Sequence, residues 1–520
     1  MKTILHTIVF LLIWATLKAQ SSNELVYNVD AGIMDIERVE GMEVDFLYSC
    51  GRTFEFSASV GLINKTDVSG NLYWSRRIEF DGLAPAFNDL EINQEGELLV
   101  VGYYSSGTGL TGVFLKLNSD GEILMAKSLE LSGYTYLKSI HQKSNGNYLV
   151  VGENGYDIVI FEFDSSGNMI DSRRLGTENR EIFHSMDVNE NGDILLVGSY
   201  SDSSYESEEG LLVKLNENLE IIWSKLIFRD VSSTDTPVIA RDCVNEGQLT
   251  TVVLQAPGDE YLEIESRGRD IAVIKIDDMG SIASEILVDL GYYETVHDLQ
   301  ISADGDIFLT GDISPLSVNE NVESFVLGLD GSFTTLEANM YSRVMDDLLL
   351  LNSIVIDDAS NYLASVGQTS LNAQVYRGYQ THHTIGADGC AAAEIEGVSY
   401  DPEFILEDIE LDSLALEAVV SDLAYDVSVL SNSVSVICSE PLSSNSLKPE
   451  MDIEIYPNPC ADYFQIEGLS KPSLIRVRDV LGRTVLETKY LNGRINAEQW
   501  PGGMYLIEIE GEQTYRIVKN

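Results

Sequence analysis

The sequence is poor in basic residues and in long apolar runs, and these two shortages exclude several classes of protein. Its 520 residues include 32 lysines and arginines against 84 aspartates and glutamates, a formal net charge of −52. A surface of this charge repels nucleic acids and anionic membranes, so neither is predicted as a partner. Beyond the N-terminal region, no apolar run approaches the about twenty residues that a transmembrane helix needs. No transmembrane segment is therefore predicted.

Cysteine is also scarce, with five residues in the whole sequence: Cys50, Cys243, Cys390, Cys438 and Cys460. A disulfide scaffold would use more cysteines and an even number, and no pair here has the spacing of zinc ligands. We predict a bridge between Cys390 and Cys438, because the two bracket one segment of a chain that is expected to be exported. At least one thiol then stays free or pairs between chains.

The familiar catalytic motifs are missing as well. The sequence contains no GxSxG elbow, HExxH helix, Walker loop or dinucleotide fingerprint. The stretch VSGNLYWS (68–75) comes nearest to the Asp-box of sialidases but lacks its aspartate. Acidic residues are so abundant that no glycosidase pair can be singled out. We predict no catalytic, cofactor-binding or metal-ligating residue and do not expect an enzyme.

The N-terminus has the pattern of a secretory signal peptide. Lys2 supplies a positive charge, Ile8 to Leu17 form a ten-residue apolar run, and Ala19-Gln20 is a plausible cleavage point. No cysteine follows that point, so a lipoprotein anchor is not expected. Residues 1–19 are predicted to be removed during export, and the mature protein is expected to be soluble.

A short element recurs along most of the chain. It appears as EGELLVVG (95–102), NGNYLVVG (145–152), NGDILLVG (191–198) and DGDIFLTG (304–311). An alternating run such as VFLKLNSDG (113–121) follows each copy, then a turn and a further strand. Alternation with period two between NG or DG turns predicts β-hairpins, so each unit holds about four strands.

The repeat predicts an all-β, seven-bladed β-propeller, since four short strands every fifty or so residues are what a blade requires. The predicted units are 34–82, 83–133, 134–179, 180–230, 231–291, 292–342 and 343–401. Glu24–Val29 is expected to complete the seventh blade as its outermost strand. The alternative is an open β-solenoid, which would use shorter and more uniform repeats. The NG/DG…LVG and KLNSDG elements resemble secreted bacterial propellers of the SBBP type, a resemblance that implies a fold and no function.

The sequence changes character after the linker PLSSNSLKPE (441–450). The remaining residues alternate in short runs and predict a small β-sandwich. They closely resemble the C-terminal sorting domain of proteins exported by the type IX secretion system of Bacteroidota. The residues that carry the resemblance are Tyr456, Pro457, Asn458, Pro459, Asp479, Gly482, Gly503, Tyr505 and Lys519.

This resemblance implies that the secretion machinery is a partner and that the protein is secreted or attached to the outer surface of the outer membrane. The alternative is an ordinary terminal sandwich used for adhesion. The predicted division of the chain is a signal peptide (1–19), a propeller (20–401), an acidic extension and linker (402–447) and a sorting domain (448–520).

The stretch DVNENGDILLVG (187–198) begins like a calcium loop, with Asp187, Asn189 and Asn191 as oxygen donors. A helix-type loop needs an acid at its twelfth position, which here is Gly198. We therefore predict a hairpin turn in which Gly192 has positive φ. Weak calcium binding by Asp187–Asp193 is the alternative, and no other cofactor is expected.

Two histidines, His184 and His297, stand eight residues before their turn glycines, as does Asn88, and Asn352 is expected to be their counterpart in the seventh blade. This position is predicted to start the innermost strand of a blade, beside the central channel. A channel site is conceivable, but the two histidines belong to blades four and six, and a structural role is preferred. The pair His382-His383 lies on a predicted strand, where neighbouring side chains point to opposite faces.

The second hairpin of each blade varies in length and is polar, as in 153–157, 199–210, 255–270 and 312–324. These hairpins should share one face of the propeller, and loops on a rigid scaffold often bind ligands. The alternative is that they merely tolerate insertions. The predicted function is a non-catalytic binding or adhesion module for an extracellular protein or polysaccharide. The alternatives are an extracellular hydrolase of glycans or peptides, with its site on these loops, and a surface coat.

Overall fold

The computed structural model divides the chain into two compact units, Met1–Ser443 and Ser444–Asn520. The residues it describes are 23–27, 31–39, 46–55, 58–67, 71–80, 82–107, 109–202, 208–229, 237–257, 269–291, 293–314, 322–341, 348–357, 362–371, 375–384, 392–394, 398–400, 404–415, 419–422, 426–429, 434–439, 454–456, 463–467, 473–479, 483–490, 494–497, 499–501, 503–509 and 514–519. These residues form strands and turns without a helix, so none of them provides a helix that is long and apolar enough to cross a membrane.

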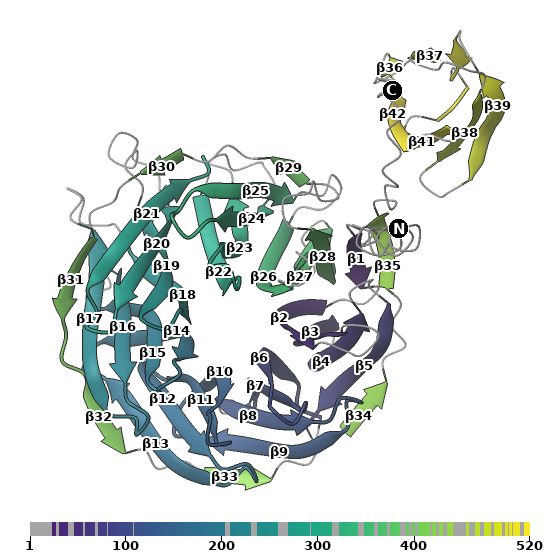
Figure 1. Ribbon diagram of the computed structural model, residues 1–520. Helices are drawn as coiled ribbons and strands as arrows, with labels where there is room; N and C mark the ends of the chain where they lie inside the picture. Colours follow the sequence, from purple (N-terminus) through teal and green to yellow (C-terminus); the bar gives the residue numbers. More distant parts are fainter. Residues whose placement is uncertain are drawn as a thin grey trace, which may run out of the picture. The chain divides into compact units, whose positions relative to one another are not determined.

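The described part of the first unit contains seven five-stranded antiparallel sheets, which lie like blades around a central axis (Figure 1). The predicted all-β propeller is therefore confirmed as the fold. From the inner strand outward, the sheets are β2 (Ala31–Val39), β3 (Phe46–Glu55), β4 (Ala58–Asp67), β5 (Leu72–Glu79) and β34 (Asp426–Val429) in blade 1; β6 (Pro85–Ile92), β7 (Leu98–Ser105), β8 (Leu110–Leu117), β9 (Ile123–Glu130) and β33 (Val419–Asp422) in blade 2; β10 (Thr135–Gln142), β11 (Tyr148–Asn154), β12 (Asp157–Phe163), β13 (Met169–Gly176) and β32 (Asp412–Ala415) in blade 3; β14 (Arg180–Val188), β15 (Ile194–Ser201), β16 (Glu208–Leu215), β17 (Ile221–Arg229) and β31 (Phe404–Asp408) in blade 4; β18 (Ile239–Asn245), β19 (Leu249–Pro257), β20 (Arg269–Asp277), β21 (Ile282–Asp289) and β30 (Val398–Tyr400) in blade 5; β22 (Tyr293–Ile301), β23 (Ile307–Ser314), β24 (Glu323–Leu329), β25 (Thr335–Tyr341) and β29 (Ala392–Glu394) in blade 6; and β26 (Leu348–Asp357), β27 (Tyr362–Leu371), β28 (Val375–Thr384), β1 (Asn23–Tyr27) and β35 (Val434–Ser439) in blade 7.

The N-terminal strand closes the ring. β1 pairs with β28 of the last blade, where Leu25 lies opposite Gln380, so the strand predicted to complete blade 7 is in place. It is not the outermost strand as expected, because β35 pairs along its other edge. The two ends of the first unit are therefore hydrogen-bonded to each other within one sheet.

The fifth strands come from one segment, which we call the belt (392–439, strands β29 to β35). The belt passes the blades in the order six, five, four, three, two, one and seven, and adds one short antiparallel strand to each outer edge. In blade 4, for example, Leu406 lies opposite Ile227. Without the belt, the outer edge of each fourth strand would have unpaired backbone N–H and C=O groups.

The belt differs from the predicted division of the chain. The boundary expected at residue 401 falls inside the first unit, and the segment predicted as an acidic extension (402–447) contributes strands β31 to β35 to five blades. Strands of four to six residues are too short for an alternating pattern to stand out in the sequence, so this part of the fold was missed.

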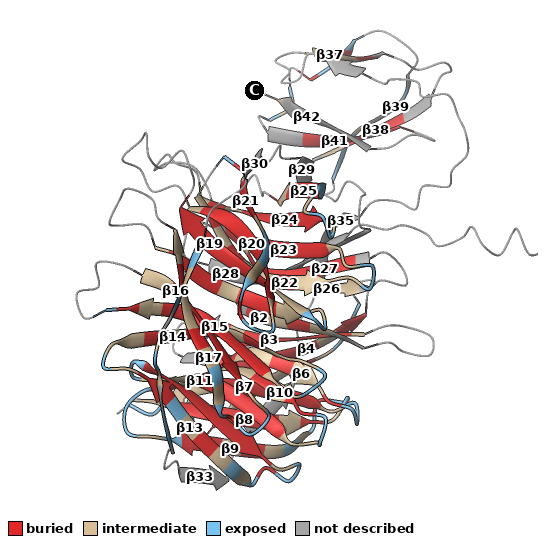
Figure 2. Ribbon diagram, turned by 60° about the vertical axis from the view of Figure 1, so that its left-hand side comes forward, coloured by how far each residue is buried: buried red, intermediate tan, exposed pale blue. Residues whose placement is uncertain are grey.

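The middle strands of blades 2 to 6 are buried along most of their length (Figure 2). All seven residues of β12 are buried, as are the first five residues of β7 and all residues of β8 except Leu110 and Lys116. Each sheet is covered on both faces by its neighbours, so apolar side chains are needed on both faces of a middle strand. Clusters such as Val253, Val273, Val296 and Leu309 join adjacent blades.

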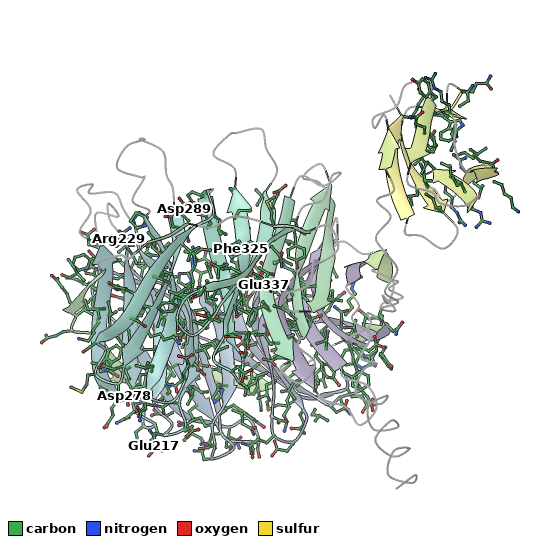
Figure 3. All side chains as sticks on the ribbon, turned by 45° about the horizontal axis from the view of Figure 1, so that its top comes forward. Glu217, Arg229, Asp278, Asp289, Phe325 and Glu337 are labelled. Atoms are coloured by element: carbon green, nitrogen blue, oxygen red, sulfur yellow. The ribbon has the colours of Figure 1, made fainter. Side chains whose placement is uncertain are left out.

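The blade connections and the third hairpins lie at opposite ends of the sheets. Figure 3 shows Arg229 and Asp289, at the ends of outer strands, on one side, and Glu217 and Asp278, in third-hairpin turns, on the other. The variable second hairpins leave from the same side as the blade connections. Most of their tips, including 203–207, 258–268 and 315–321, lie outside the described residues.

Two buried cysteines, Cys50 and Cys243, are free thiols. Cys390 lies outside the described residues, and with it the predicted bridge to Cys438.

The second unit has a three-stranded sheet and a four-stranded sheet in its described part. They are β36 (Glu454–Tyr456), β37 (Tyr463–Glu467) and β40 (Ile495–Asn496), and β39 (Thr484–Tyr490), β38 (Ser473–Asp479), β41 (Gly503–Ile509) and β42 (Thr514–Lys519). Its core includes Phe464, Val477 and Ile507, with Trp500 packed against it.

Candidate functional site

Every inner strand has a β-bulge at the same place, and the bulge creates the wall of the central channel. In blade 4, for example, the register shifts between Phe183 and Ser185, which leaves His184 without a partner in the ladder. We call the extra residues the bulge residues: Met34, Asn88, Lys138, His184, Arg241, His297 and Asn352. Together with the residue that follows each, they line a cavity of about 140 Å³.

The bulge explains the glycine that ends the repeated LVG element. A Cβ atom on Gly198 would lie 1.9 Å from the carbonyl oxygen of Ile182, and one on Gly102 would lie 2.0 Å from that of Ala86. The bulge pushes the inner strand against its neighbour, and in six blades a glycine at this place allows the two backbones to approach, whereas blade 5 has Leu254 there. The recurring glycine of the sequence therefore marks the channel wall.

Three bulge residues tie neighbouring blades together. The side-chain nitrogens of Asn88, Lys138 and Asn352 donate to backbone carbonyls of the next blade, at 2.6, 2.5 and 2.7 Å. The accepting carbonyl in each case belongs to the residue before the next bulge. These three side chains satisfy backbone groups that the bulge removes from the ladder.

A set of aspartates makes a second tie between blades. Asp35, Asp89, Asp242 and Asp298, each directly after a bulge residue, accept backbone N–H bonds from the next inner strand at 2.7 to 2.8 Å. Ser353 Oγ lies 2.9 Å from Asp35 Oδ1 and 2.8 Å from Asp298 Oδ2. A hydroxyl has one proton, so one of these carboxyl groups must be protonated for both bonds to form.

Burial and mutual repulsion raise the pKa of these carboxyl groups. Burial raises the pKa of Asp89 to about 6. The pKa of Asp35 is raised by burial and by the charges of Asp89, Glu37 and Asp298. The pKa of Asp242 is raised by burial and by Asp298, and burial also raises that of Asp298. Asp89 therefore holds a proton at mildly acidic pH, and the other three aspartates are shifted in the same direction.

Four consecutive blades present nitrogen-bearing side chains to the cavity: Lys138, His184, Arg241 and His297. Lys138 pairs with Glu153 at 2.6 Å, and His297 pairs with Asp312. Arg241 donates from Nε and Nη2 to the amide oxygen Oε1 of Gln255, at 3.2 and 2.7 Å. In a chain of such negative charge, this arc of the channel is unusually basic.

His184 is the neutral member of the arc. Burial lowers its pKa well below the usual value, and the charges of Arg241 and Lys138 lower it further. Within the described part of the chain, nothing hydrogen-bonds to its ring. A neutral imidazole offers one N–H donor and one nitrogen lone pair to whatever enters the cavity.

The sequence located half of this arc. It placed His184, His297, Asn88 and Asn352 beside the channel, and all four line the cavity. Lys138 also stands eight residues before its turn glycine, Gly146, and extending the same rule to blade 3 would have found it. Arg241 was missed because its hairpin is shorter, with Gly247 only six residues later. The side chains of His382 and His383 lie outside the described part.

The suspected calcium loop is a hairpin turn in the structure. Gly192 has a φ of 83°, and its N–H donates to Asn189 O at 2.9 Å. Asn189 Oδ1 accepts from the N–H groups of Asn191 and Asp193, both at 2.9 Å. Asp187 Oδ2 accepts from Asn245 N of blade 5 at 2.6 Å. The donors therefore serve the turn and the seam between blades, and calcium binding remains an untested alternative.

A carboxylate cluster that the sequence did not single out lies between blades 5 and 6. Carboxylate oxygens of Asp270, Asp289 and Glu294 lie within 4.8 Å of one another. Glu294 is fully buried, and its Oε1 accepts from Leu290 N at 3.2 Å. Its members come from three consecutive strands, β20, β21 and β22, and only the fold brings Asp270 back to the other two.

In the second unit, several of the predicted sorting residues lie on neighbouring strands. Asp479 lies opposite Tyr505, and Gly503 lies opposite Lys519. The Tyr505 hydroxyl donates to Pro501 O at 2.8 Å, and its ring contacts Trp500. Tyr456 ends β36. The remaining four, Pro457, Asn458, Pro459 and Gly482, lie outside the described residues.

Comparison with known families identifies the second unit. Residues 454–520 match the model of the secretion system C-terminal sorting domain. The chain is thus a type IX secretion cargo, secreted or displayed on the outer surface, as predicted. Residues 114–236 match a second model, described as arylsulfotransferase (ASST). No curated protein matches the chain.

Solved structures similar to this chain include several β-propellers. The propeller domain of the trilobed protease from Pyrococcus furiosus is 11% identical, with a TM-score of 0.40, over 70% of this chain and 97% of that one. PorZ, a surface component of the type IX secretion system of Porphyromonas gingivalis, is 13% identical, with a TM-score of 0.29. That alignment covers 93% of this chain and only 59% of PorZ.

Proposed function

We propose that this exported propeller is a non-catalytic binding module that holds part of an extracellular ligand in its central channel. The observation that carries the proposal is the cavity of about 140 Å³, to which all seven blades contribute a bulge residue. The strands behind it are rigid, since side chains of Asn88, Asp89 and Asn352 tie adjacent blades by hydrogen bonds. A concave site with polar groups on a rigid wall is the usual form of a ligand site.

A steric block of the channel tests the proposal. Met34 lines the cavity from blade 1 and carries no charge, so Met34→Trp fills the space and leaves the basic arc unchanged. The probes are dextran, polygalacturonate and chondroitin sulfate, immobilised and exposed to labelled full-length protein. We expect the natural chain to bind at least one of them and Met34→Trp to lose that binding. Tyr73→Trp, at a side chain that is 53% exposed on the rim, is the matched control. Equal binding by Met34→Trp and the natural chain would exclude the channel.

Sulfuryl transfer is the second candidate, and the match of residues 114–236 to the arylsulfotransferase model favours it. This stretch contains Lys138 and His184, which both face the cavity. The unprotonated nitrogen of His184 would attack the sulfur of an aryl sulfate while the bond from sulfur to the phenol oxygen breaks. The sulfuryl group would then pass to a second phenol, whose proton leaves with solvent.

The assay is the release of 4-nitrophenolate from 4-nitrophenyl sulfate, with phenol as acceptor. The enzyme hypothesis expects release by the natural chain and its loss in His184→Asn. Release no faster than in buffer would rule out this candidate and favour the binding module.

A further inference from the structure

The guanidinium of Arg241 is a charge in the channel wall whose hydrogen-bond partner is neutral. It donates to Gln255, an amide that is 1% exposed and that is fixed in turn by its own bond to Glu294 O at 3.0 Å. Within the described residues, Arg241 forms no ion pair. Burial and the charge of Arg269 lower its pKa, and the charges of Glu208 and Asp312, which raise the pKa, offset this only in part. A partly buried charge of this kind calls for a counter-ion.

Two other members of the arc have acidic partners within the protein. Lys138 is paired with Glu153, so its charge is balanced by the protein, and the ring of His297 is already bound to Asp312. Arg241 and the neutral His184 remain, from adjacent blades, with hydrogen-bond donors free to face the cavity. Arg241 donates from Nε and Nη2 to Gln255. The N–H groups of Nη1 and the second N–H of Nη2 can donate to two oxygens of one group.

The four aspartates in the same wall do not oppose an anion as fully charged groups would. Each directs one oxygen at a backbone N–H of the next blade. The bridging position of Ser353 between Asp35 and Asp298 requires a proton on one of them. A proton on one of these aspartates removes one negative charge from the wall that faces the cavity.

We propose that the channel cavity binds an oxyanion, a carboxylate or a sulfate ester carried by the ligand, through the guanidinium of Arg241 and a ring N–H of His184. This inference rests on the proposed binding function and names the chemical class of its ligand. A guanidinium binds planar and tetrahedral oxyanions with two parallel hydrogen bonds, so either a carboxylate or a sulfate ester fits this site.

Calorimetric titration with three sugars of one scaffold tests the inference: glucose, glucuronate and glucose 6-sulfate. We expect full-length protein to bind one or both charged sugars, more weakly at high salt, and to show no heat with glucose. The stronger of the two charged sugars identifies the source as carboxylate or sulfate. Arg241→Gln is expected to lose at least about tenfold in affinity. Arg76→Gln, which makes the same change of charge outside the cavity, should bind like the natural chain.

The ligand-free melting temperature separates a binding role from a structural one. Arg241→Gln removes a partly buried charge that forms no ion pair within the described residues, so its melting temperature should be no lower than that of the natural chain. The inference is overturned if glucose binds as well as glucuronate, if neither charged sugar binds, or if Arg241→Gln keeps full affinity. Loss of polysaccharide binding in Met34→Trp together with full binding in Arg241→Gln would retain the proposed function and reject the oxyanion.

Discussion

At the scale of single residues, one backbone irregularity produces both the recurring glycine and the channel side chains. The bulge turns one residue of each inner strand toward the axis and forces a close approach of the strand beside it. Gly198 and His184 are thus two consequences of the same bulge, one in the repeat motif and one in the candidate site. The recurring glycine is here a packing requirement, while the cavity-lining position varies from Met34 to Arg241.

Gly198→Ala should be strongly destabilising. The new Cβ would lie 1.9 Å from a backbone carbonyl oxygen, which cannot rotate away as a side chain can. We expect a loss of about 3 kcal/mol or more in the free energy of unfolding, measured by urea denaturation. The control is Gly331→Ala, whose Cβ would meet its nearest atom at 3.4 Å. Similar losses in the two variants would contradict the role of the bulge.

At the scale of secondary-structure elements, the belt is the least expected part of the molecule. Its seven strands pair with outer edges that a four-stranded blade would leave open. In blades 2 and 4, a lysine of the covered edge lies opposite an aspartate of the belt: Lys127 opposite Asp422 and Lys225 opposite Asp408. Opposite charges on paired strands favour docking. The acidity of residues 402–426 thus has a structural explanation besides solubility.

The belt is expected to stabilise the propeller through a few apolar contacts as well as its hydrogen bonds. Leu406 packs against the core between blades 4 and 5, whereas Leu414, also on the belt, is 55% exposed. Leu406→Ala should cost about 1 to 2 kcal/mol, and Leu414→Ala less than about 0.5 kcal/mol. Hydrogen exchange of the β17 amides should rise in the first variant only. Equal losses of stability in the two variants would mean that the apolar contacts of the belt do not stabilise the propeller.

At the scale of the whole molecule, the ring is held closed by contacts between inner strands. Asparagine, lysine and aspartate side chains cross from blade to blade around the channel, and β1 and β35 close the ring at the rim. The aspartates of this system are buried and close to one another, which raises their pKa. The stability of the ring should therefore depend on pH.

The Asp89 carboxyl group has a folded-state pKa of about 6 against an ordinary value of 3.8. Because the folded state binds the proton more tightly, this group stabilises the fold below about pH 4, and that stabilisation is lost as the pH rises through about 6. Asp89→Asn keeps an oxygen for Ile140 N and does not ionise. Relative to the natural chain, it should gain up to about 3 kcal/mol between pH 4 and pH 7.5, at 1.36 kcal/mol per pKa unit. Urea denaturation of both proteins at pH 4 and pH 7.5 measures this difference in the free energy of unfolding. The prediction is refuted if the difference between the two proteins is the same at both pH values.

The sequence alone determined what local patterns can encode. Period-two alternation and glycine turns specified the β-hairpins and their repetition, and a set of motifs at the C-terminus specified the sorting domain and with it the destination of the protein. His184 and His297 were placed beside the channel because their distance from a turn glycine is a local property.

The tertiary structure decided what depends on residues far apart in the chain. The belt pairs residues 392–439 with strands throughout the propeller, and its short strands carry little pattern of their own. The neutral hydrogen-bond partner of Arg241 becomes visible only when Gln255 of the neighbouring strand is in place. Turns and periodicity depend on neighbouring residues, whereas a site at the axis of the ring is formed by the bulge residues of all seven blades.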